Sequence, residues 1–185
     1  MLKRTLIAFL SITATGPAAA LQPAAPGVPF AATGTVQYAF TSADHADAMI
    51  IAAIDAAHRQ VLVQAYSLTH RRIADALIRA RSRGVEVAVI ADNEQSRTNP
   101  VALSELVHAG VPLLFDGEHS AAHNKIIVID SGYADCAVIT GSFNFTYAAQ
   151  QRNAENALIL RGNPPLCEAY FGNWRRHQIH SRPPR

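Results

Sequence analysis

The sequence lacks the excess of positive charge that is typical of nucleic-acid-binding proteins. Its formal net charge is +2 at pH 7, and the chain without Lys3 and Arg4 is formally neutral. Net charge therefore gives no support for binding to a polyanion. Any such attraction must come from local arginine clusters, each of which is equally typical of a solvated helix face. These clusters are Arg71 with Arg72, Arg79 to Arg83, and Arg175 with Arg176.

Cysteine is scarce, because Cys136 and Cys167 are the only two in the chain. In an oxidising compartment an even pair is compatible with one disulfide. The pair is equally compatible with two separately buried thiols that pack as small hydrophobes. The sequence leaves both possibilities open, because it says nothing of the distance between the two Cα atoms.

Metal-ligand spacing is also missing from the sequence. The histidines outside the motif described below are not spaced with cysteines or paired carboxylates in the way that metal ligands are, so the sequence predicts no metal and no cofactor. These residues are His45, His58, His70, His108, His119, His177 and His180. His119 differs from the others only because it lies in the segment leading to His123, and an ordinary loop position is expected there too.

No apolar run reaches the roughly 20 residues that are needed to span a bilayer. Residues 1–20 instead have the layout of a secretory signal peptide. Lys3 and Arg4 are followed by the apolar run Leu6 to Ile12 and by the small residues Ala18 to Ala20. We therefore expect cleavage near Ala20, a periplasmic or secreted protein, and no stable insertion in a membrane afterwards.

The length of 185 residues suits one ordinary domain and is too short for two comfortable ones. Residues 21–34 are rich in proline and alanine and are expected to form a flexible leader. Residues 35–180 are then a single catalytic domain, and residues 181–185 are a C-terminal tail.

Apolar patterning predicts an α/β domain, since short continuous apolar runs favour buried strands and a 3.6-residue period favours helices. The expected strands are Thr35 to Phe40, Val61 to Tyr66, Val85 to Ile90, Val111 to Phe115, Lys125 to Ile129, Ala137 to Thr140 and Ala157 to Arg161. The expected helices are Asp44 to His58, Arg71 to Arg83, Val101 to Ala109 and Leu166 to His177, and Asp92 to Pro100 is expected to be a polar loop. Two of the strands, Lys125 to Ile129 and Ala137 to Thr140, lie too close together for a crossover helix and should form an antiparallel hairpin. The sum is a mixed, mostly parallel β-sheet flanked by helices on both faces.

The run His123, Asn124, Lys125 carries the first chemical signal. Strand alternation sends His123 and Lys125 to the same face at the mouth of a strand. Lys125 is also the only lysine besides Lys3, in a chain whose remaining cationic side chains are arginines. This selectivity favours a specific need for a compact ammonium group at that position.

Further polar residues follow in an order that suits phosphodiester chemistry. Hydrolysis of a phosphodiester without a metal needs a nucleophile, a proton donor and fixed donors for the anionic oxygens. Histidine fills the first two roles near neutral pH. Lys125, Ser142 and Asn144 can supply the donors. Glu155 can accept the N–H of one imidazole nitrogen of His123 and leave the other nitrogen free to attack.

The pattern H-x-K-x₄-D from His123 to Asp130, followed by G-S-x-N from Gly141 to Asn144, resembles the signature of the phospholipase D superfamily. Glu155 stands where the nuclease branch of that family has an acidic residue. The likeness extends from Thr35 to Gln178 and is closest to the small bacterial endonucleases of the superfamily. Its other segments are Val63 to Thr69, Arg83 to Val87 and Gly141 to Thr146.

The resemblance implies that His123 attacks phosphorus to form a phosphohistidine and that a second histidine protonates the leaving oxygen. The family builds this site from two copies of the motif, and this chain has one. The resemblance therefore implies a homodimer in which His123 of each copy enters one shared active site. Asp130 belongs to the family pattern and is included among the candidate catalytic residues. Its position at the far end of the strand favours a structural hydrogen-bonding role.

The substrate expected from the resemblance is DNA or RNA, cleaved by a metal-independent endonuclease of low sequence specificity. A phospholipase D acting on phospholipid headgroups or cardiolipin is the alternative, because the same chemistry serves either leaving group. A non-catalytic protein that binds polyanions is a third possibility, against which the intact His123, Lys125, Asn144 and Glu155 argue.

Overall fold

The computed structural model describes residues 27, 29–98 and 100–184, so the expected signal peptide lies outside the described residues. From Ala31 onwards the described residues form one compact unit. Within the expected leader, residues 31–34 have no regular secondary structure, but they contact the domain. Thr33 Oγ1 donates a hydrogen bond to the carbonyl of Gly162 at 2.9 Å. None of the described helices combines the length and the hydropathy that a membrane crossing requires.

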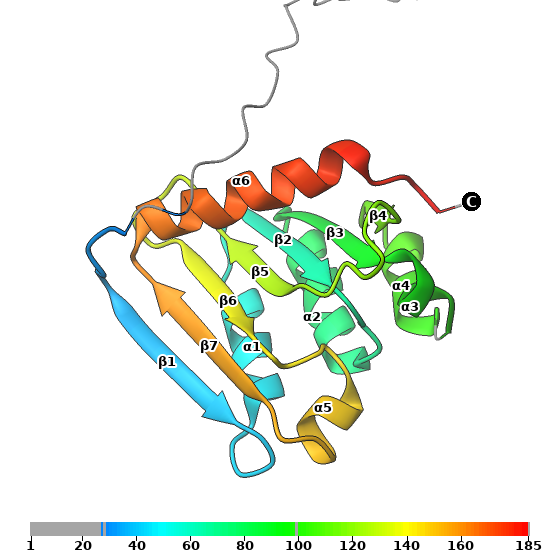
Figure 1. The fold of residues 1–185 in the computed structure, drawn as a ribbon, viewed down its shortest axis with the longest axis horizontal. Helices are drawn as coiled ribbons and strands as arrows, with labels where there is room; N and C mark the ends of the chain where they lie inside the picture. Colours follow the sequence, from blue (N-terminus) through cyan, green and yellow to red (C-terminus); the bar gives the residue numbers. More distant parts are fainter. Residues whose placement is uncertain (1–26, 28, 99, 185) are drawn as a thin grey trace, which may run out of the picture. The chain divides into compact units, whose positions relative to one another are not determined.

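The unit is built on a seven-stranded sheet with the order β1-β7-β6-β5-β2-β3-β4 (Figure 1). The strands are β1 (Thr35–Phe40), β2 (Gln60–Ala65), β3 (Glu86–Asp92), β4 (Leu113–Asp116), β5 (Lys125–Ile129), β6 (Ala137–Gly141) and β7 (Asn156–Arg161). The helices are α1 (Ala46–Asp55), α2 (Arg71–Ser82), α3 (Asn93–Thr98), α4 (Val101–His108), α5 (Tyr147–Gln151) and α6 (Pro164–His180). The predicted mixed α/β fold is confirmed.

The prediction of a mostly parallel sheet is wrong. Only β2 with β3 and β3 with β4 pair in parallel, and these strands are joined through α2 and through α3 and α4. The other four pairings are antiparallel, including β5 with β6, as the hairpin prediction required. Short connections explain the β5–β6 and β6–β7 pairings, because neither has room for a long crossover helix. The pairing of β1 with the distant β7 could not be derived from local sequence.

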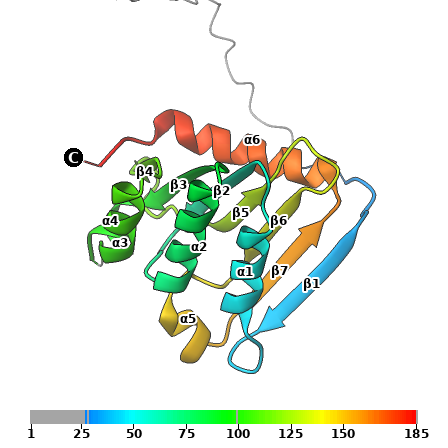
Figure 2. The same ribbon diagram turned by 180° about the vertical axis from the view of Figure 1, so that it is seen from behind.

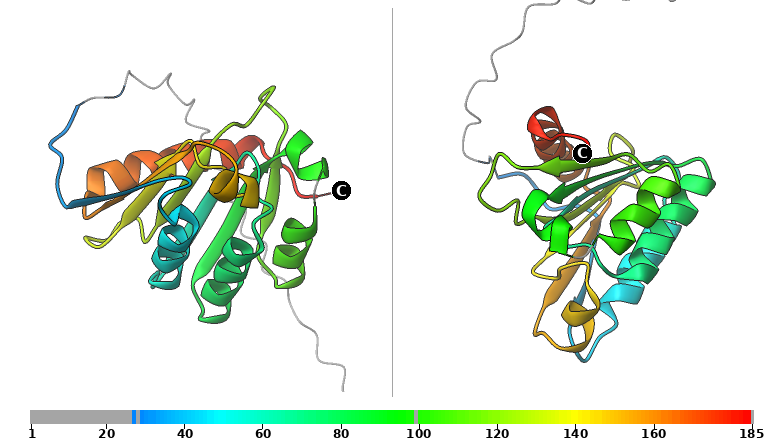
Figure 3. Two further views of the ribbon diagram at one scale, coloured as in Figure 1. Left: turned by 90° about the horizontal axis from the view of Figure 1, so that it is seen from below. Right: turned by 90° about the vertical axis from the view of Figure 1, so that its right-hand side faces the viewer.

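Helices cover both faces of the sheet, as expected. In Figure 2, α1 and α2 lie in front of the sheet, and the two views of Figure 3 show α6 on the opposite face. Strand β5 contributes to both cores because its side chains alternate. Ile127 and Ile129 join the larger core with α1 and α2, whereas Ile126 and Val128 pack on the side of Trp174 in α6.

The question left open for the cysteines is answered by a disulfide between Cys136 and Cys167. Their Cα atoms are 6.4 Å apart, which lies within the range for such a bond. Cys136 directly precedes β6 and Cys167 lies in the first turn of α6. The bridge therefore ties the start of this helix to the sheet.

Three local differences from the prediction have identifiable causes. The expected polar loop Asp92 to Pro100 contains α3. Asp92 caps this helix, because its Oδ1 accepts a hydrogen bond from Gln95 N at 2.8 Å. Helix α5 is too short to give a periodic signal, and Thr146 caps it by accepting from Ala149 N. Helix α6 begins earlier than expected, because Asn163 caps it and proline is tolerated in the first turn.

Candidate active site

His123 and Lys125 lie at the point where the chain enters β5. Lys125 Nζ is 3.0 Å from His123 Nδ1 and also donates to the His123 carbonyl at 2.8 Å. The ring of Tyr66, which directly follows β2, packs against the imidazole with centroids 4.3 Å apart. An ammonium group can only donate, so Nδ1 is the unprotonated nitrogen of His123 in this arrangement. The imidazole itself is exposed to solvent.

The ammonium group of Lys125 is held in an environment that weakens its hold on the proton. Burial lowers the pKa of Lys125, and the negative charge of Glu155 offsets part of that effect. The ammonium also lies 4.7 Å from the centroid of the Tyr66 ring, within the range of a cation–π contact. A buried cation beside the exposed His123 is suited to bind a phosphate oxygen.

The loop after β6 presents Ser142 and Asn144. Gly141 ends β6 where a Cβ atom would collide with the carbonyl oxygen of Asn156, so the close approach of the two strands requires glycine here. Ser142 Oγ accepts from Asn156 N at 3.0 Å, which leaves its hydroxyl proton free to donate. Among the described residues no partner reaches Asn144 Oδ1, although this atom is buried.

Glu155 directly precedes β7 and is partly exposed. Its Oε1 accepts from Asn153 Nδ2 at 3.0 Å, and its backbone N–H donates to Thr41 Oγ1. Among the described residues, the predicted hydrogen bond from the His123 imidazole to Glu155 is not formed: Nδ1 of that ring faces Lys125 Nζ, and Glu155 Oε1 accepts from Asn153. The orienting role of Glu155 stays a prediction.

Four of the chain segments meet at one edge of the sheet. Ala65 at the end of β2 pairs with Lys125 at the start of β5. Ile127 pairs with Ile139, and the same register extended by two residues on each strand sets Lys125 level with Gly141. Gly141 in turn pairs with Ala157. The sequence-predicted residues His123, Lys125, Ser142, Asn144 and Glu155 therefore all project from this edge.

Asp130 lies at the opposite end of β5. Its carboxylate accepts three backbone N–H groups, from His58 at 2.9 Å and from Arg59 and Gln60 at 2.7 Å each. The residue has a positive φ of 50°, a conformation that aspartate adopts more readily than most residues. Asp130 thus organises the turn that leads into β2 and is not brought together with His123.

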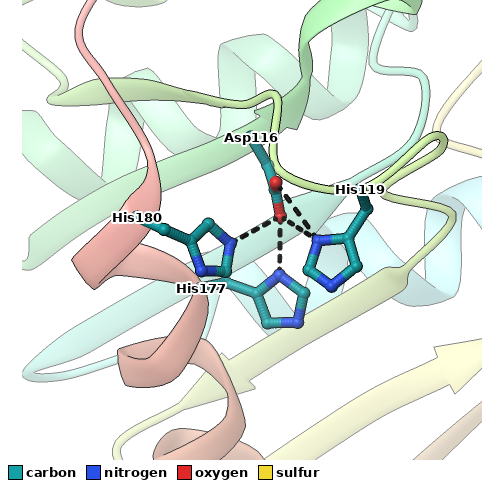
Figure 4. Close-up of side chains that lie close together, drawn as sticks. All are labelled: Asp116, His119, His177 and His180. Carbon is teal, nitrogen blue, oxygen red and sulfur yellow. Dashed lines mark hydrogen bonds and ion pairs between the residues drawn. The ribbon is translucent and has the colours of Figure 1, made fainter.

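A second cluster, formed by Asp116, His119, His177 and His180, lies at the end of β4 (Figure 4). Burial alone would raise the pKa of Asp116, but hydrogen bonds from the three imidazoles and from the Glu118 N–H hold it well below its ordinary value. This group was not predicted from the sequence. Its signal is two i, i+3 pairs, one in the loop after β4 and one in the last turn of α6, which become a cluster only when α6 crosses the sheet.

Comparison with known proteins decides the family. A family model described as cardiolipin synthase, PLD-like domain, matches residues 50–173 of the chain. The chain belongs to the phospholipase D superfamily. The enzymes of this superfamily act on phosphodiester bonds, so the reading of the H-x-K-x₄-D and G-S-x-N patterns is confirmed at the level of the family.

Curated relatives of this phospholipase D superfamily member carry two kinds of name. A phospholipase D of Rickettsia conorii is 41% identical over 121 residues, which are 65% of this chain and 58% of that protein. The chain thus matches a little more than half the length of that relative. A mitochondrial cardiolipin hydrolase of Xenopus tropicalis is 34% identical over 103 residues, which are 56% of this chain and 47% of that protein.

Among solved structures, the phospholipase D family member Nuc from Salmonella typhimurium has the same fold. Its TM-score is 0.76 at 32% sequence identity, and the match covers 82% of this chain and 98% of that chain. NucT from Helicobacter pylori matches with a TM-score of 0.67 at 20% identity, over 80% of this chain and 98% of that chain, and shows the fold alone.

Proposed function

We propose that this phospholipase D superfamily member is a phosphodiesterase that cleaves nucleic acid through a phosphohistidine at His123. The observation that carries the proposal is the pairing of an exposed imidazole with the buried ammonium of Lys125, 3.0 Å from its Nδ1. No group of three or more potential metal-ligand side chains within the described part of the chain includes His123. The chemistry that we propose uses side chains alone.

A phosphate group changes the bonding of His123 in a way that starts the reaction. Its anionic oxygens attract the ammonium of Lys125 and the free hydroxyl proton of Ser142. Once Lys125 turns to the phosphate, the neutral imidazole of His123 changes tautomer: Nε2 gives up its proton to solvent, and Nδ1 takes up a proton, which it donates in a hydrogen bond to a carboxylate such as that of Glu155. The lone pair of Nε2 then attacks phosphorus while the bond to the leaving oxygen breaks. Water later attacks phosphorus and gives its proton to the group that had protonated the leaving oxygen, while the bond between phosphorus and Nε2 breaks and releases His123.

The leaving oxygen needs a proton from a second histidine, and the motif occurs once in the chain. We propose that His123 of a second copy supplies this proton. A two-fold axis would bring the sheet edge that carries His123 in one copy against the same edge of the other copy. The buried Asn144 Oδ1, which lacks a partner among the described residues, supports an edge that is completed by another molecule. The homodimer is then part of the catalyst.

Nucleic acid is favoured by the side chains that border this edge. Tyr147, at the start of α5, is 61% exposed and can stack on a base. Arg152, between α5 and β7, is exposed as well. The side chains of Arg71 and Arg72, at the start of α2, are 72% and 66% exposed. Arg71 and Arg72 form ion pairs with Glu105 and Asp47 at 2.8 and 3.3 Å, and the exposed parts of their guanidinium groups can still contact phosphates although the chain has little net charge.

A mixing experiment tests the nucleophile and the dimer together. Wild-type chains and His123→Asn chains are unfolded, mixed in equal amounts and refolded, and cleavage of single-stranded DNA is measured with excess chelator. If both imidazoles act in one site, activity falls to about one quarter of the wild-type value, because only homodimers of wild-type chains work. An activity of about one half of the wild-type value would mean that each chain works alone, which would contradict an active site shared by two chains. A mixture with His58→Ala, an exposed histidine at the opposite edge, should keep full activity.

A phospholipid is the second candidate substrate. The names of the Rickettsia and Xenopus relatives favour it, as do the exposed rings of Tyr38 and Phe40, 64% and 56% accessible on β1. Phe40 pairs with Asn156, so these rings flank the proposed site. The test compares the rate of headgroup release from cardiolipin vesicles with the rate of DNA or RNA cleavage. A faster release of headgroup would identify phospholipid, and not nucleic acid, as the substrate.

The proposal places the enzyme outside the cytoplasm, in the periplasm or the medium. The layout of residues 1–20 supports export, and the disulfide between Cys136 and Cys167 suits an oxidising compartment. Cell fractionation tests it, because a protein that keeps residues 1–20 and stays in the cytoplasm would contradict export.

A further inference from the structure

Three imidazoles converge on one buried carboxylate at the end of β4. Asp116 Oδ2 lies 2.7 Å from His177 Nδ1, 3.1 Å from His180 Nε2 and 3.2 Å from His119 Nδ1. The four potential ligand atoms all lie within 4.8 Å of one another. Figure 4 shows the three rings pointing at the same oxygen from the loop after β4 and from the end of α6.

Hydrogen bonding alone accounts poorly for this arrangement. A carboxylate oxygen has about two lone pairs, and three ring nitrogens lie near Asp116 Oδ2, although that of His119 is shared with Oδ1 at 3.3 Å. The rings also lie close to one another, with centroids 4.9 Å apart for His119 and His177, 5.3 Å for His119 and His180, and 5.2 Å for His177 and His180. Positive charge on all three rings would make them repel one another. Neutral rings whose lone pairs face a common cation avoid both problems.

We propose that Asp116, His119, His177 and His180 bind a Zn²⁺ ion. Zinc bonds of about 2.0–2.2 Å to nitrogen and oxygen in a tetrahedron separate neighbouring ligand atoms by roughly 3.3–3.5 Å. The contacts of Asp116 Oδ2 with the three nitrogens, 2.7–3.2 Å long, need a small expansion to reach that spacing, and the nitrogens, which lie within 4.8 Å of one another, need small rotations of their rings. Imidazole nitrogen and carboxylate oxygen are both ordinary zinc ligands, and four protein ligands make a closed structural site.

The surroundings allow an ion to reach the cluster and to stay. Exposure rises from 0% for the Asp116 side chain through 14% for His177 and 25% for His180 to 47% for His119. His180 also lines a surface cavity of about 950 Å³ between α3, α4 and the end of the chain. A charged ligand is therefore buried at the back of the site, and the ring of His119 closes it on the solvent side.

The ion would join two segments that the fold otherwise holds by few contacts. His119 belongs to the loop between β4 and His123, and His177 and His180 belong to the last turns of α6. Apart from the cluster, the segment just after α6 meets β4 through the backbone pairing of Phe115 with Arg182, and Leu114 of β4 packs in the core that contains Trp174 of α6. Bound zinc would thus fix the loop that leads to His123 without touching substrate. This inference goes beyond the proposed function and does not depend on it.

Zinc binding is tested on the full chain, expressed without a polyhistidine tag and freed of metals by a chelator. Zn²⁺ is titrated in competition with a chromophoric chelator, and the visible spectrum of the Co²⁺-loaded protein reports the geometry. We expect one Zn²⁺ per chain and the strong visible absorption of tetrahedral cobalt. His119→Ala and His180→Ala should each weaken binding at least tenfold, whereas His58→Ala should bind as the wild type does. His119 is the most exposed ligand, so its variant is expected to fold, which circular dichroism verifies.

Two results would overturn the assignment. The first is Zn²⁺ affinity in a folded His119→Ala variant equal to that of the wild type. The second is a wild-type protein that binds Cu²⁺ or Ni²⁺ with these residues but not Zn²⁺. A thermal scan gives an independent readout, because Zn²⁺ should raise the melting temperature of the wild type and of His58→Ala but not that of His119→Ala.

Discussion

The group around His123 and the cluster around Asp116 differ in how fully their polar atoms are paired. The imidazole of His123 is exposed and contacts a single cation, and Asn144 Oδ1 is buried without a partner among the described residues. Asp116 is fully buried, and its carboxylate accepts hydrogen bonds from three imidazoles and one backbone N–H. A site that must bind and release substrate keeps bonding capacity free, whereas a structural cluster holds its polar atoms in lasting bonds, to one another or to the proposed Zn²⁺ ion.

The largest expected effect is the loss of turnover when His123 is replaced, compared with the replacement of His119 in the cluster around Asp116. His123→Asn removes the proposed nucleophile and should lower kcat/KM for DNA cleavage by about 10⁴-fold or more, since no other group forms the covalent intermediate. His119→Ala acts only through the loop before His123 and should lower it less than about tenfold. Steady-state kinetics on both variants at equal folded concentration measures the difference. Equal losses in the two variants would erase the distinction between the groups.

The next effect concerns the charge of Lys125. Burial lowers the pKa of this residue, so its ammonium is lost as the pH rises through a value below that of an ordinary lysine. Activity that depends on the ammonium should therefore fall on the alkaline side earlier than an exposed lysine would allow. Lys125→Arg keeps its charge there but changes the shape of the donor, so we expect about 10²-fold lower activity near neutral pH without this alkaline fall.

The pH dependence of kcat/KM for wild type and Lys125→Arg measures this effect. Arg81→Lys, which adds an ordinary lysine to the exposed face of α2, serves as the control and should leave the profile unchanged. An alkaline limb that persists unaltered in Lys125→Arg would assign it to another group.

The site around His123 could largely be predicted from the sequence. The residues around His123 form a motif in which neighbours in sequence remain neighbours in space, since His123 and Lys125 flank the start of one strand. Ser142 and Asn144 follow in the loop directly after the strand that pairs with it. Both the order of these residues and the helices and strands that carry them could be predicted from local patterns.

The cluster around Asp116 could not be predicted in that way. Asp116 and His177 are 61 residues apart, and they meet only because α6 crosses the face of the sheet. The same limitation explains the error about strand direction, because β1 pairs with β7 from the other end of the chain. Contacts between distant segments depend on the packing of the whole domain. A single sequence without that packing carries no local signal for them.

The smallest expected effect on turnover is that of Asp130→Asn. Asp130 belongs to the sequence motif of His123, but its carboxylate, like that of Asp116, is used in hydrogen bonds within the chain. Asp130→Asn keeps a side chain that tolerates positive φ and keeps one oxygen acceptor. It loses part of the bonding to the backbone N–H groups of residues 58–60 and should lower the free energy of unfolding by about 2 kcal/mol. Urea denaturation measures this loss, and kcat/KM of the folded variant should stay within about threefold of the wild type. If Asp130→Asn lowered kcat/KM as much as His123→Asn does and left the free energy of unfolding unchanged, Asp130 would have a catalytic role.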